Sequence, residues 1–598
     1  MNEKIRKMYA REAASLDALT WEDGLVRSKG PGHTRGAQVE VIHSGVITSR
    51  NYVLGRAVGK LTKDDGLCIL SALRRLQVTQ GMENPDALPR LDAGAQLGAF
   101  RWYLEEDRIW DTNAAFFICM PLITHRLLLP ECFSEEETAV IDETLAFAGN
   151  WFYHECQHAI YYYSNKILSD GAALSAIAYL TGNEAYRRMA VEFFGKWLDY
   201  TEQRGWGWGE NTSLGYNGVI FPALRIAERT IGDEVTAQRI RAVLDNQKRF
   251  FRFYDGHEVA PSIRTYNYEG LAERPSLVYN LAGVPGSGLN DLSIAGSDMF
   301  ICFNDELYEN DAELMASGYT PVSAPRCLKI RVFDEVYATS WYGEHIALGT
   351  LNAFPVISGI DRNATWGLGW QSMPVSFVVY GAHTGYLRFF VNDGEIERAH
   401  PKRNYLSPRL FSETILPRVT TCSAQDGPIA VTIRAIDRIN NRAQAVLDEW
   451  YINRFNADML RLEHDGREFI ALRYAAATVI IGALNGMCYG ANRGASHIEA
   501  VRGADGLLRL QQVFYRGTLQ TLMADRVESA WLTLVIDHAA SDEEIAKTVK
   551  TLQIEDNSWT DGFEPRDEWA LLRTVRASLN EYHAELHYDP YRFPGGQH

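Results

Sequence analysis

The chain has 598 residues, of which 46% are hydrophobic and 23% are charged. This composition is typical of a folded globular protein, and the length exceeds what one hydrophobic core serves, so we expect two or three domains. The formal net charge of −17 argues against nucleic acid and anionic membranes as partners, although a locally basic cleft would still admit an anionic substrate.

The N-terminal residues indicate the compartment of the protein, and the cysteines indicate whether it has a zinc site or disulfides. Residues 1–24 lack the apolar core of a signal peptide, and no apolar run reaches transmembrane length. We therefore expect a cytoplasmic protein, or a periplasmic or secreted one if a leader was removed. The eight cysteines are scattered without a CxxC pair, so neither a zinc pattern nor a disulfide framework is indicated.

The first half of the chain is predicted to be mainly helical. Residues 1–60 form a mixed N-terminal segment with a Gly-rich piece at 29–36 and a strand-like stretch at 39–47. From 61 to 325 we expect a helical domain, because apolar residues recur at helical spacing between 64 and 254; residues 255–325 are loop-rich. The predicted helices span 64–78, 112–129, 134–156, 169–180, 183–203, 216–231 and 233–254.

Local sequence features mark the ends of these helices. Ser134 and Glu137 form a capping box at the start of the third helix, and Gly182 is a stop after the fourth. Successive helices with short connections pack as antiparallel hairpins. No fixed-period repeat is present, which favours a ring of helices over a regular solenoid.

The second half is predicted to be mainly β-structure. From 326 to 540 the hydrophobic period changes to two, which indicates a large antiparallel domain of the sandwich type. The predicted strands lie within 327–343, 373–381, 386–393, 429–437, 468–484, 507–517 and 529–537. In 541–598 we expect two C-terminal helices, 541–552 and 566–586, that pack back on the body.

Polar and aromatic residues gather in residues 161–228, which are predicted to form two helices, a Gly/Trp-rich loop and a third helix. Asn165 stands at one helix start, and Tyr216 and Asn217 stand at another. The candidate residues around them, in chain order, are Asn113, His154, His158, Trp206, Trp208, Glu210, Arg264, Tyr268 and His345.

This set resembles polysaccharide lyases that combine an incomplete (α/α) toroid with a following antiparallel β-sheet domain. In that group an Asn opens a helix, a loop with a Tyr follows about two helices later, and an Arg comes later still. Asn165, Tyr216 and Arg264 match this order, with 51 residues between the first two. The segment 109–117 also looks like an early toroid helix. The fold that the resemblance implies is a multidomain α + β protein, with the toroid at 61–325 and a β-sandwich at 326–540.

One departure concerns histidine. Many members of the group carry a His shortly before the Tyr of this loop, and the segment ENTSLGY has none. His154, His158 or His257 would then serve as the base, or Tyr216 would act alone.

The resemblance implies a reaction on an acidic poly- or oligosaccharide. A lyase removes the C5 proton of a uronic acid and expels the 4-O-glycosyl oxygen. Asn and Arg neutralise the carboxylate and stabilise the enediolate that develops. Tyr or His removes the C5 proton, and Tyr also protonates the leaving oxygen. Tyr268 is a further catalytic candidate, and Asn113, Asn217, Trp206, Trp208, Glu210 and His345 are candidates for substrate binding. The scheme requires no metal and no cofactor.

Several of the candidates also have a structural interpretation. An Asn before an apolar helix, such as Asn165, is more often a helix N-cap. Tyr216 reads equally as a core tyrosine, and Arg264 as half of a loop ion pair. The WGWG segment around Trp206 and Trp208 reads as a cleft wall or as a tight packed turn. His345 reads as a buried histidine at a strand end.

Three other functions remain open on the sequence. A toroid glycoside hydrolase would use two carboxylates from Glu210, Asp111 and Asp170. The string HECQH at 154–158 satisfies the HExxH pattern of zinc peptidases, in which His154 and His158 would bind the metal. A non-catalytic glycan-binding protein is the third.

Overall fold

The computed structural model describes most of the helical half and the strands of the second half. The described residues are 13–79, 96–161, 163–208, 210–254, 260–261, 325–333, 336–354, 373–380, 383–392, 418–437, 445–452, 457–489, 492–493, 497–503, 506–517, 526–557 and 573–588. They belong to two compact units. The first contains Met1–Gln203 and Gly215–Arg252, and the second contains Arg204–Leu214 and Thr320–His598.

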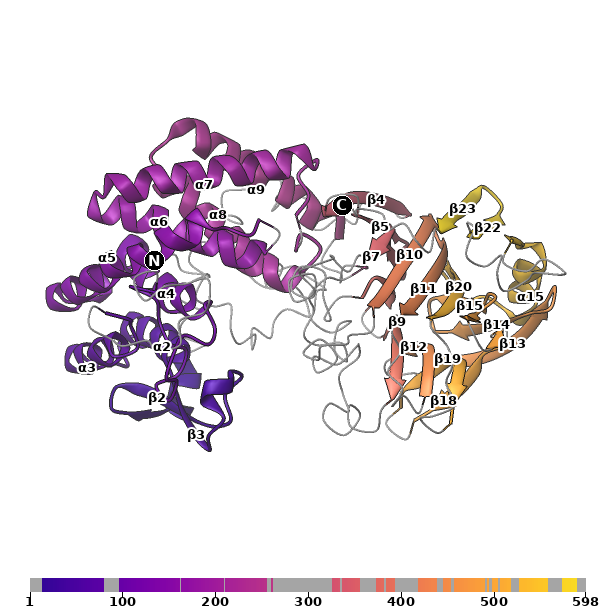
Figure 1. Ribbon diagram of the computed structural model, residues 1–598, viewed down its shortest axis with the longest axis horizontal. Helices are drawn as coiled ribbons and strands as arrows, with labels where there is room; N and C mark the ends of the chain where they lie inside the picture. The colour runs from indigo at the N-terminus through magenta and orange to yellow at the C-terminus, as the bar shows by residue number, and fades with distance from the viewer. Residues whose placement is uncertain are drawn as a thin grey trace. The chain divides into compact units, whose positions relative to one another are not determined.

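The first unit is mainly helical (Figure 1). It opens with a short 3-10 turn and a small sheet of β1 (Thr20–Glu22), β2 (Leu25–Lys29) and β3 (Val41–Ser44), with a second 3-10 turn between β2 and β3. The helices are α2 (Gly45–Ala57), α3 (Lys63–Arg74), α4 (Ala114–Leu128), α5 (Glu135–Gln157), α6 (Ser164–Thr181), α7 (Glu184–Gln203), α8 (Leu214–Thr230) and α9 (Glu234–Tyr254). All seven predicted helical segments are confirmed. The helix α2 was not predicted.

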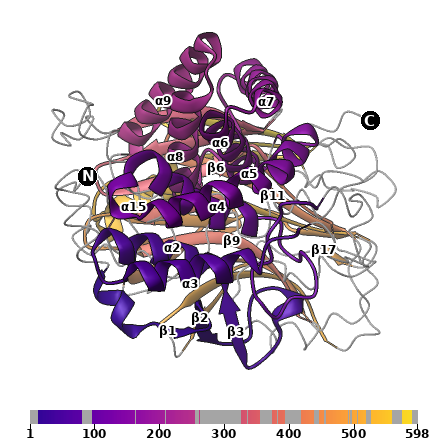
Figure 2. The same cartoon turned by 90° about the vertical axis from the view of Figure 1, so that its left-hand side faces the viewer.

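Buried and amphipathic helices alternate along this unit, whose helices face the viewer in Figure 2. In α6 every residue from Ser164 to Ala178 is buried, and α2 and α4 are buried along most of their length. By contrast α5 and α7 expose one charged face. A helix that is buried on all sides needs neighbours all round it, and α6 contacts α4, α5 and α7. The closure of these helices into an incomplete toroid stays a prediction.

The predicted capping box at the start of α5 is confirmed, and it is part of a larger buried ion-pair network. Glu137 is fully buried and accepts the backbone N–H of Ser134 at 2.8 Å. The same carboxylate accepts Arg56 Nε at 2.7 Å, Arg56 Nη2 at 2.9 Å and the Tyr52 hydroxyl at 3.1 Å. Burial alone would raise the pKa of Glu137, but these donors hold it below its usual value. Glu137 therefore ties α5 to α2.

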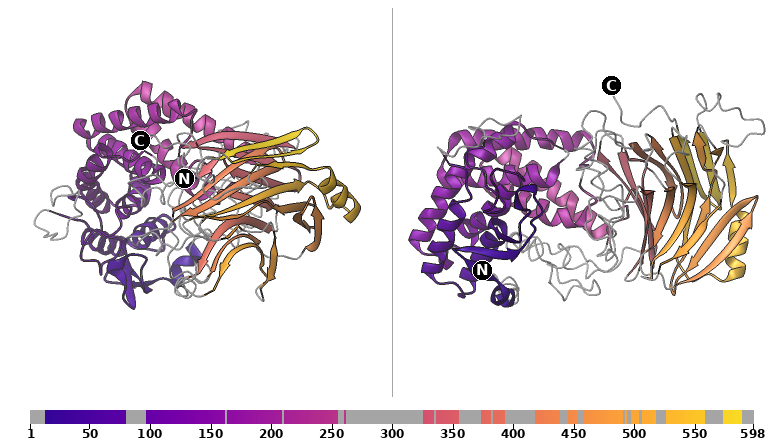
Figure 3. Two further views of the ribbon diagram at one scale, coloured as in Figure 1. Left: turned by 45° about the vertical axis from the view of Figure 1, so that its right-hand side comes forward. Right: turned by 60° about the horizontal axis from the view of Figure 1, so that its bottom comes forward.

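The second unit contains two large antiparallel sheets (Figure 3). Eight described strands follow the order β18-β19-β12-β9-β8-β6-β5-β4. They are β4 (Arg326–Phe333), β5 (Val336–Tyr342), β6 (Ile346–Leu351), β8 (Val375–Val379), β9 (His383–Asn392), β12 (Ala445–Ile452), β18 (Glu499–Arg502) and β19 (Leu508–Arg516).

The other large sheet follows the order β13-β14-β15-β20-β11-β10-β7, and β16 and β17 extend it beside β20. Its strands are β7 (Ala353–Phe354), β10 (Arg418–Asp426), β11 (Ile429–Asp437), β13 (Asp458–His464), β14 (Arg467–Arg473), β15 (Thr478–Ala483), β16 (Met487–Tyr489), β17 (Asn492–Arg493) and β20 (Arg526–Ile536). All the predicted strand segments contain strands.

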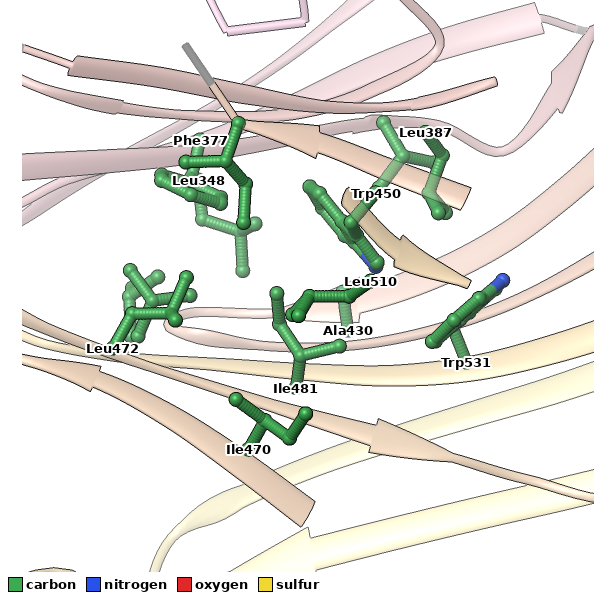
Figure 4. Packing of buried hydrophobic residues seen from close by; sticks show 14 of the residues in the cluster. Leu348, Phe377, Leu387, Ala430, Trp450, Ile470, Leu472, Ile481, Leu510 and Trp531 are labelled. Atoms are coloured by element: carbon green, nitrogen blue, oxygen red, sulfur yellow. The ribbon is translucent and has the colours of Figure 1, made fainter. Parts of the chain in front are cut away.

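The two large sheets share one hydrophobic core (Figure 4). Phe377 and Trp450 come from the first sheet, and Ile481 and Trp531 come from the second. These side chains are fully buried. Two sheets with such a shared core form a sandwich, as the change of hydrophobic period indicated.

A third layer covers the outer face of the larger sheet. It consists of α15 (Asp542–Thr551) and a small sheet of β21 (Gln553–Asp556), β22 (Arg573–Leu579) and β23 (Tyr582–Tyr588). Their buried side chains, among them Ile545, Val575 and Leu586, pack on residues such as Val431 and Leu532. The larger sheet is therefore buried on both faces.

The prediction of a second C-terminal helix at 566–586 is wrong. Its described part is the hairpin of β22 and β23, in which Leu579 pairs with Tyr582 across a turn whose Asn580 has a positive φ of 54°. Asn tolerates this left-handed conformation. Buried Val575 and Ala577 alternate with residues that are less buried, and this period-two pattern prevails over the helix-forming Arg, Leu and Glu of the segment. The helix at 541–552 is confirmed as α15, with Ser541 as its N-cap.

Candidate functional site

Two close approaches fix the directions of α6, α7 and α8. Gly171, in the middle of α6, faces the Phe193 ring in the middle of α7, and only Gly182 and Asn183 connect the two helices. Such a pair is antiparallel. Just beyond the C-terminal end of α8, Gly232 lies against the side chain of Arg187 near the start of α7, so α7 and α8 are antiparallel as well.

The helices α6 and α8 therefore run parallel, and Ser175 Oγ lies 2.7 Å from Thr230 Oγ1 between them. Asn165 precedes Ser175 by about 15 Å along α6, and Tyr216 precedes Thr230 by about 21 Å along α8, at a rise of 1.5 Å per residue. The two candidate catalytic residues thus lie at the same end of the helical unit.

The N-terminal end of α4 joins the same group. Asn113 comes directly before α4, and its Nδ2 donates a hydrogen bond of 3.0 Å to the hydroxyl of Tyr163, the N-cap residue of α6. Asn165 is the second residue of α6 and is 2% exposed. Its interpretation as an N-cap is wrong, because Tyr163 occupies that position.

Tyr216 and Asn217 lie in the first turn of α8, which begins at Leu214. Tyr216 is half-buried and Asn217 is fully buried. The N-terminal turns of α4, α6 and α8 present backbone N–H groups at one end of the unit, where helix dipoles favour negative charge. This end of the unit thus combines amide, phenol and backbone donors.

The C-terminal end of α5 reaches this group through an ion pair. Lys166, directly after Asn165, pairs with Glu155 of α5 and lies 2.5 Å from Asp170 Oδ2 one turn along α6. Asp170, a carboxylate candidate for a hydrolase, is 1% exposed. Burial, opposed by Lys166, raises its pKa to about 7.

His154 and His158 do not form the zinc-peptidase arrangement. The helix α5 ends at Gln157, and His158 is its C-cap with φ −116° and ψ 29°. Glu155, which would activate water in such a peptidase, is paired with Lys166. The two imidazole rings lie 4.7 Å apart, centre to centre. Among the described residues, no group of three or more His, Cys, Asp or Glu side chains is arranged to hold a metal.

His33, which is not among the residues predicted from the sequence, lies close to the start of α4. His33 Nε2 is 3.0 Å from Asp111 Oδ2, and His33 Nδ1 is 3.0 Å from the Tyr103 hydroxyl. Asp111 Oδ1 also accepts the backbone N–H of Asn113 at 2.9 Å. His33 is therefore linked through Asp111 and Asn113 to the start of α6. Only the Gly-rich piece at 29–36 marked this region in the sequence.

Three predicted substrate-binding residues, Trp206, Trp208 and Glu210, belong to the second unit. Trp208 and Glu210 are buried, and Trp206 has a positive φ of 66°. A Cβ at Gly207 would lie 1.7 Å from the carbonyl oxygen of Arg331, so this backbone approach requires glycine. These features favour the tight packed turn over a cleft wall.

His345 lies in the turn between β5 and β6 and is half-buried. The carboxylate of Asp537 holds this turn by accepting the backbone N–H of His345 at 2.7 Å and that of Glu344. Arg264 and Tyr268 lie outside the described residues, as does His257.

Comparisons with known proteins leave the family open. No family model matches the sequence, and no curated protein matches it. A crystal structure of heparinase III is similar over 90% of this chain and 82% of that chain, with 10% identity and a TM-score of 0.41. A structure of Escherichia coli alpha-2-macroglobulin from domain MG7 to the C-terminus is similar over 88% of this chain and 70% of that chain, with 10% identity and a TM-score of 0.23. These TM-scores are too low for either likeness to bear on function. In the part of the chain that the structure describes, no helix has the length and apolar character needed to cross a membrane.

Proposed function

We propose that the protein is a carbon–oxygen lyase that cleaves uronic-acid-containing poly- or oligosaccharides by β-elimination. The observation that supports this most is the gathering of Asn113, Asn165 and Tyr216 at one end of the helical unit, at the N-terminal ends of α4, α6 and α8. Amide, phenol and helix N-terminal N–H groups are the groups that an elimination next to a carboxylate requires.

In the proposed reaction, Asn165 donates to the uronate carboxylate, with Arg264 as a second donor. Tyr216, as phenolate, removes the C5 proton, and the electron pair of the C5–H bond is delocalised into the carboxylate as an enediolate. The pair then forms the C4–C5 double bond while the C4–O4 bond breaks. The Tyr216 hydroxyl returns its proton to the leaving oxygen, so the products are an unsaturated uronate and a free hydroxyl end.

The half-buried position of Tyr216 suits this role, because its hydroxyl needs both contact with substrate and partial exclusion of water. Asn165 and Asn217 are almost fully buried, which suits side chains held in fixed orientations.

The test is a screen of acidic polysaccharides, such as alginate, glucuronan and glycosaminoglycans, with the intact chain. We expect ultraviolet absorbance from the unsaturated uronate to rise with time on one of them. New reducing ends without this absorbance would instead indicate a hydrolase. If neither the absorbance nor new reducing ends appeared on any uronate glycan, the proposal would be contradicted.

A further inference from the structure

Lys166 is a charged side chain held inside the helical unit. Its side chain is 7% exposed, and its ammonium contacts two carboxylates from different helices, Glu155 of α5 and Asp170 of α6. The Asp170 side chain is 1% exposed and the Glu155 side chain is 18% exposed. The ring of Trp151 lies 5.8 Å from the same ammonium. None of these four residues takes part in the proposed elimination itself.

Such a cluster is costly unless its charges balance. Burial acts to lower the pKa of Lys166, but the Asp170 and Glu155 carboxylates outweigh it and hold the pKa above its usual value, so the ammonium stays charged. Removing one partner would leave an uncompensated buried charge, whereas replacing both with apolar groups of similar volume is often tolerated. The presence of a lysine here therefore calls for a reason other than stability.

The position of the cluster supplies that reason. Glu155 lies in the last turn of α5 and Lys166 in the first turn of α6, so their ion pair spans the connection between the two helices. Lys166 directly follows Asn165, and Asp170 anchors it one turn further along. Neighbouring residues on a helix have a fixed angular relation, so a clamp on Lys166 also fixes the direction of the Asn165 side chain.

We propose that Lys166 is a positioning residue: its ion pairs with Glu155 and Asp170 lock the first turn of α6 to the last turn of α5 and so hold Asn165 in the orientation that binds the uronate carboxylate. Only the role of Asn165 in binding the uronate carboxylate rests on the proposed function. The lock itself is a property of the helix ends and is measurable without substrate.

The experiment compares Lys166→Met/Asp170→Leu with Lys196→Met and wild type. The double variant removes the buried pair on α6 together, and Glu155, whose side chain is 18% exposed, keeps its access to water. The control removes a lysine from an exposed pair of the same spacing, because Lys196 Nζ lies 2.6 Å from Glu192 Oε1 on α7. Lys166→Arg, which keeps the charge, is the rescue variant.

The first measurement is amide hydrogen exchange, followed by mass spectrometry of peptides covering 158–170. The double variant is expected to exchange at least about tenfold faster there, with peptides from α7 unchanged, since local opening sets the rate. Lys166→Arg and Lys196→Met are expected to match wild type. Unchanged protection of 158–170 in the double variant overturns the lock.

The second measurement is steady-state cleavage of the glycan identified in the screen. We expect kcat of the double variant to fall about 100-fold, the effect of a misplaced catalytic group, with KM changed less than about threefold. Loss of protection with wild-type kcat would overturn the positioning role and leave the lyase assignment intact. A wild-type protein without lyase activity would overturn the proposed function, and the exchange data would still decide on the lock.

Discussion

The amide of Asn113 donates a hydrogen bond of 3.0 Å to the hydroxyl of Tyr163, fifty residues further along the chain. This contact joins the N-terminal ends of α4 and α6 and places a polar pair next to Asn165. The backbone N–H of Asn113 also donates to the carboxylate of Asp111, and this carboxylate in turn lies within hydrogen-bond distance of His33. One chain of hydrogen bonds thus connects the segment before α2 with the start of α6.

The Asn113–Tyr163 bond predicts energetic coupling between the two helix starts. Asn113→Ala and Tyr163→Phe are each expected to destabilise the helical unit by about 1 kcal/mol, the usual contribution of such a bond. The double variant is expected to lose less than the sum, because each substitution already removes the shared bond. Denaturant melts of the four proteins measure the coupling, and strictly additive losses would contradict it.

Tyr216→Phe tests the proposed acid–base residue. Without the hydroxyl, the variant is expected to keep its fold and to lose about 10²- to 10⁴-fold in kcat on the uronate glycan. The measurement is the rate of formation of the unsaturated product. Tyr179→Phe is the matched control, because Tyr179 lies on α6 and is 63% exposed. Undiminished activity of Tyr216→Phe would remove Tyr216 from the reaction.

Glu137→Gln is expected to weaken the helical unit strongly. The fully buried carboxylate accepts both Arg56 and Tyr52, and its loss leaves the guanidinium without its counter-charge. A loss of about 3 kcal/mol is expected for such a pair. The neighbouring Glu136, which pairs with Lys63 on the surface, supplies the control, since Glu136→Gln is expected to leave the unfolding midpoint unchanged. Similar midpoints for the two variants would show that the network contributes little.

Asp170 gives the helical unit a distinctive pH dependence. Its carboxyl is faced by Lys166, Glu155, Cys119 and Cys156, and burial raises its pKa to about 7, above the value of about 3.9 for an unfolded chain. Between these values the folded protein binds a proton that the unfolded chain does not. The contribution of this group to stability is therefore fully present below about pH 4 and is lost as pH rises towards 7.

Asp170→Asn removes this titration. Relative to the variant, wild type is expected to lose stability as the pH rises from about 4 to about 7, and to lose little more above that. Urea midpoints of both proteins at several pH values measure the difference. Parallel profiles would mean that Asp170 is ionised across the whole range.

Two glycines on adjacent helices are expected to respond in opposite directions to alanine. A Cβ at Gly171 would lie 2.4 Å from the Phe193 ring, so Gly171→Ala is expected to destabilise by about 1–3 kcal/mol through overpacking. At Gly195, inside α7, a Cβ would meet nothing within 4 Å, and Gly195→Ala is expected to stabilise by about 0.5–1 kcal/mol. Thermal melts check the signs, and a stabilising Gly171→Ala would contradict the close packing of α6 on α7.

Local features of the sequence were sufficient to predict most elements of the fold. The capping box of Ser134 and Glu137 and the stop at Gly182 depend on residues that are neighbours in the chain, and both are present. The helix α2 was missed because its buried face includes Thr48, Ser49 and Asn51, which weaken the apolar periodicity.

The candidate site was only partly predictable, because its contacts are tertiary. The sequence predicts that Asn165 and Tyr216 stand at helix starts, and the structure puts them in the first turns of α6 and α8. His33 lies 78 residues before Asp111, and no spacing rule connects them. Lys166 likewise reads as an ordinary helical lysine until the fold brings Glu155 against it.

The third layer of the second unit has a consequence for the length of the chain. α15 and the hairpin of β22 and β23 are short, yet they cover an apolar face that includes Val431, Ile480 and Leu532. A chain that stopped at Asp537 would keep every described strand of the two large sheets but expose that face to water. An exposed apolar surface of this kind promotes self-association, so α15 and the small sheet of β21, β22 and β23 protect the protein from aggregation.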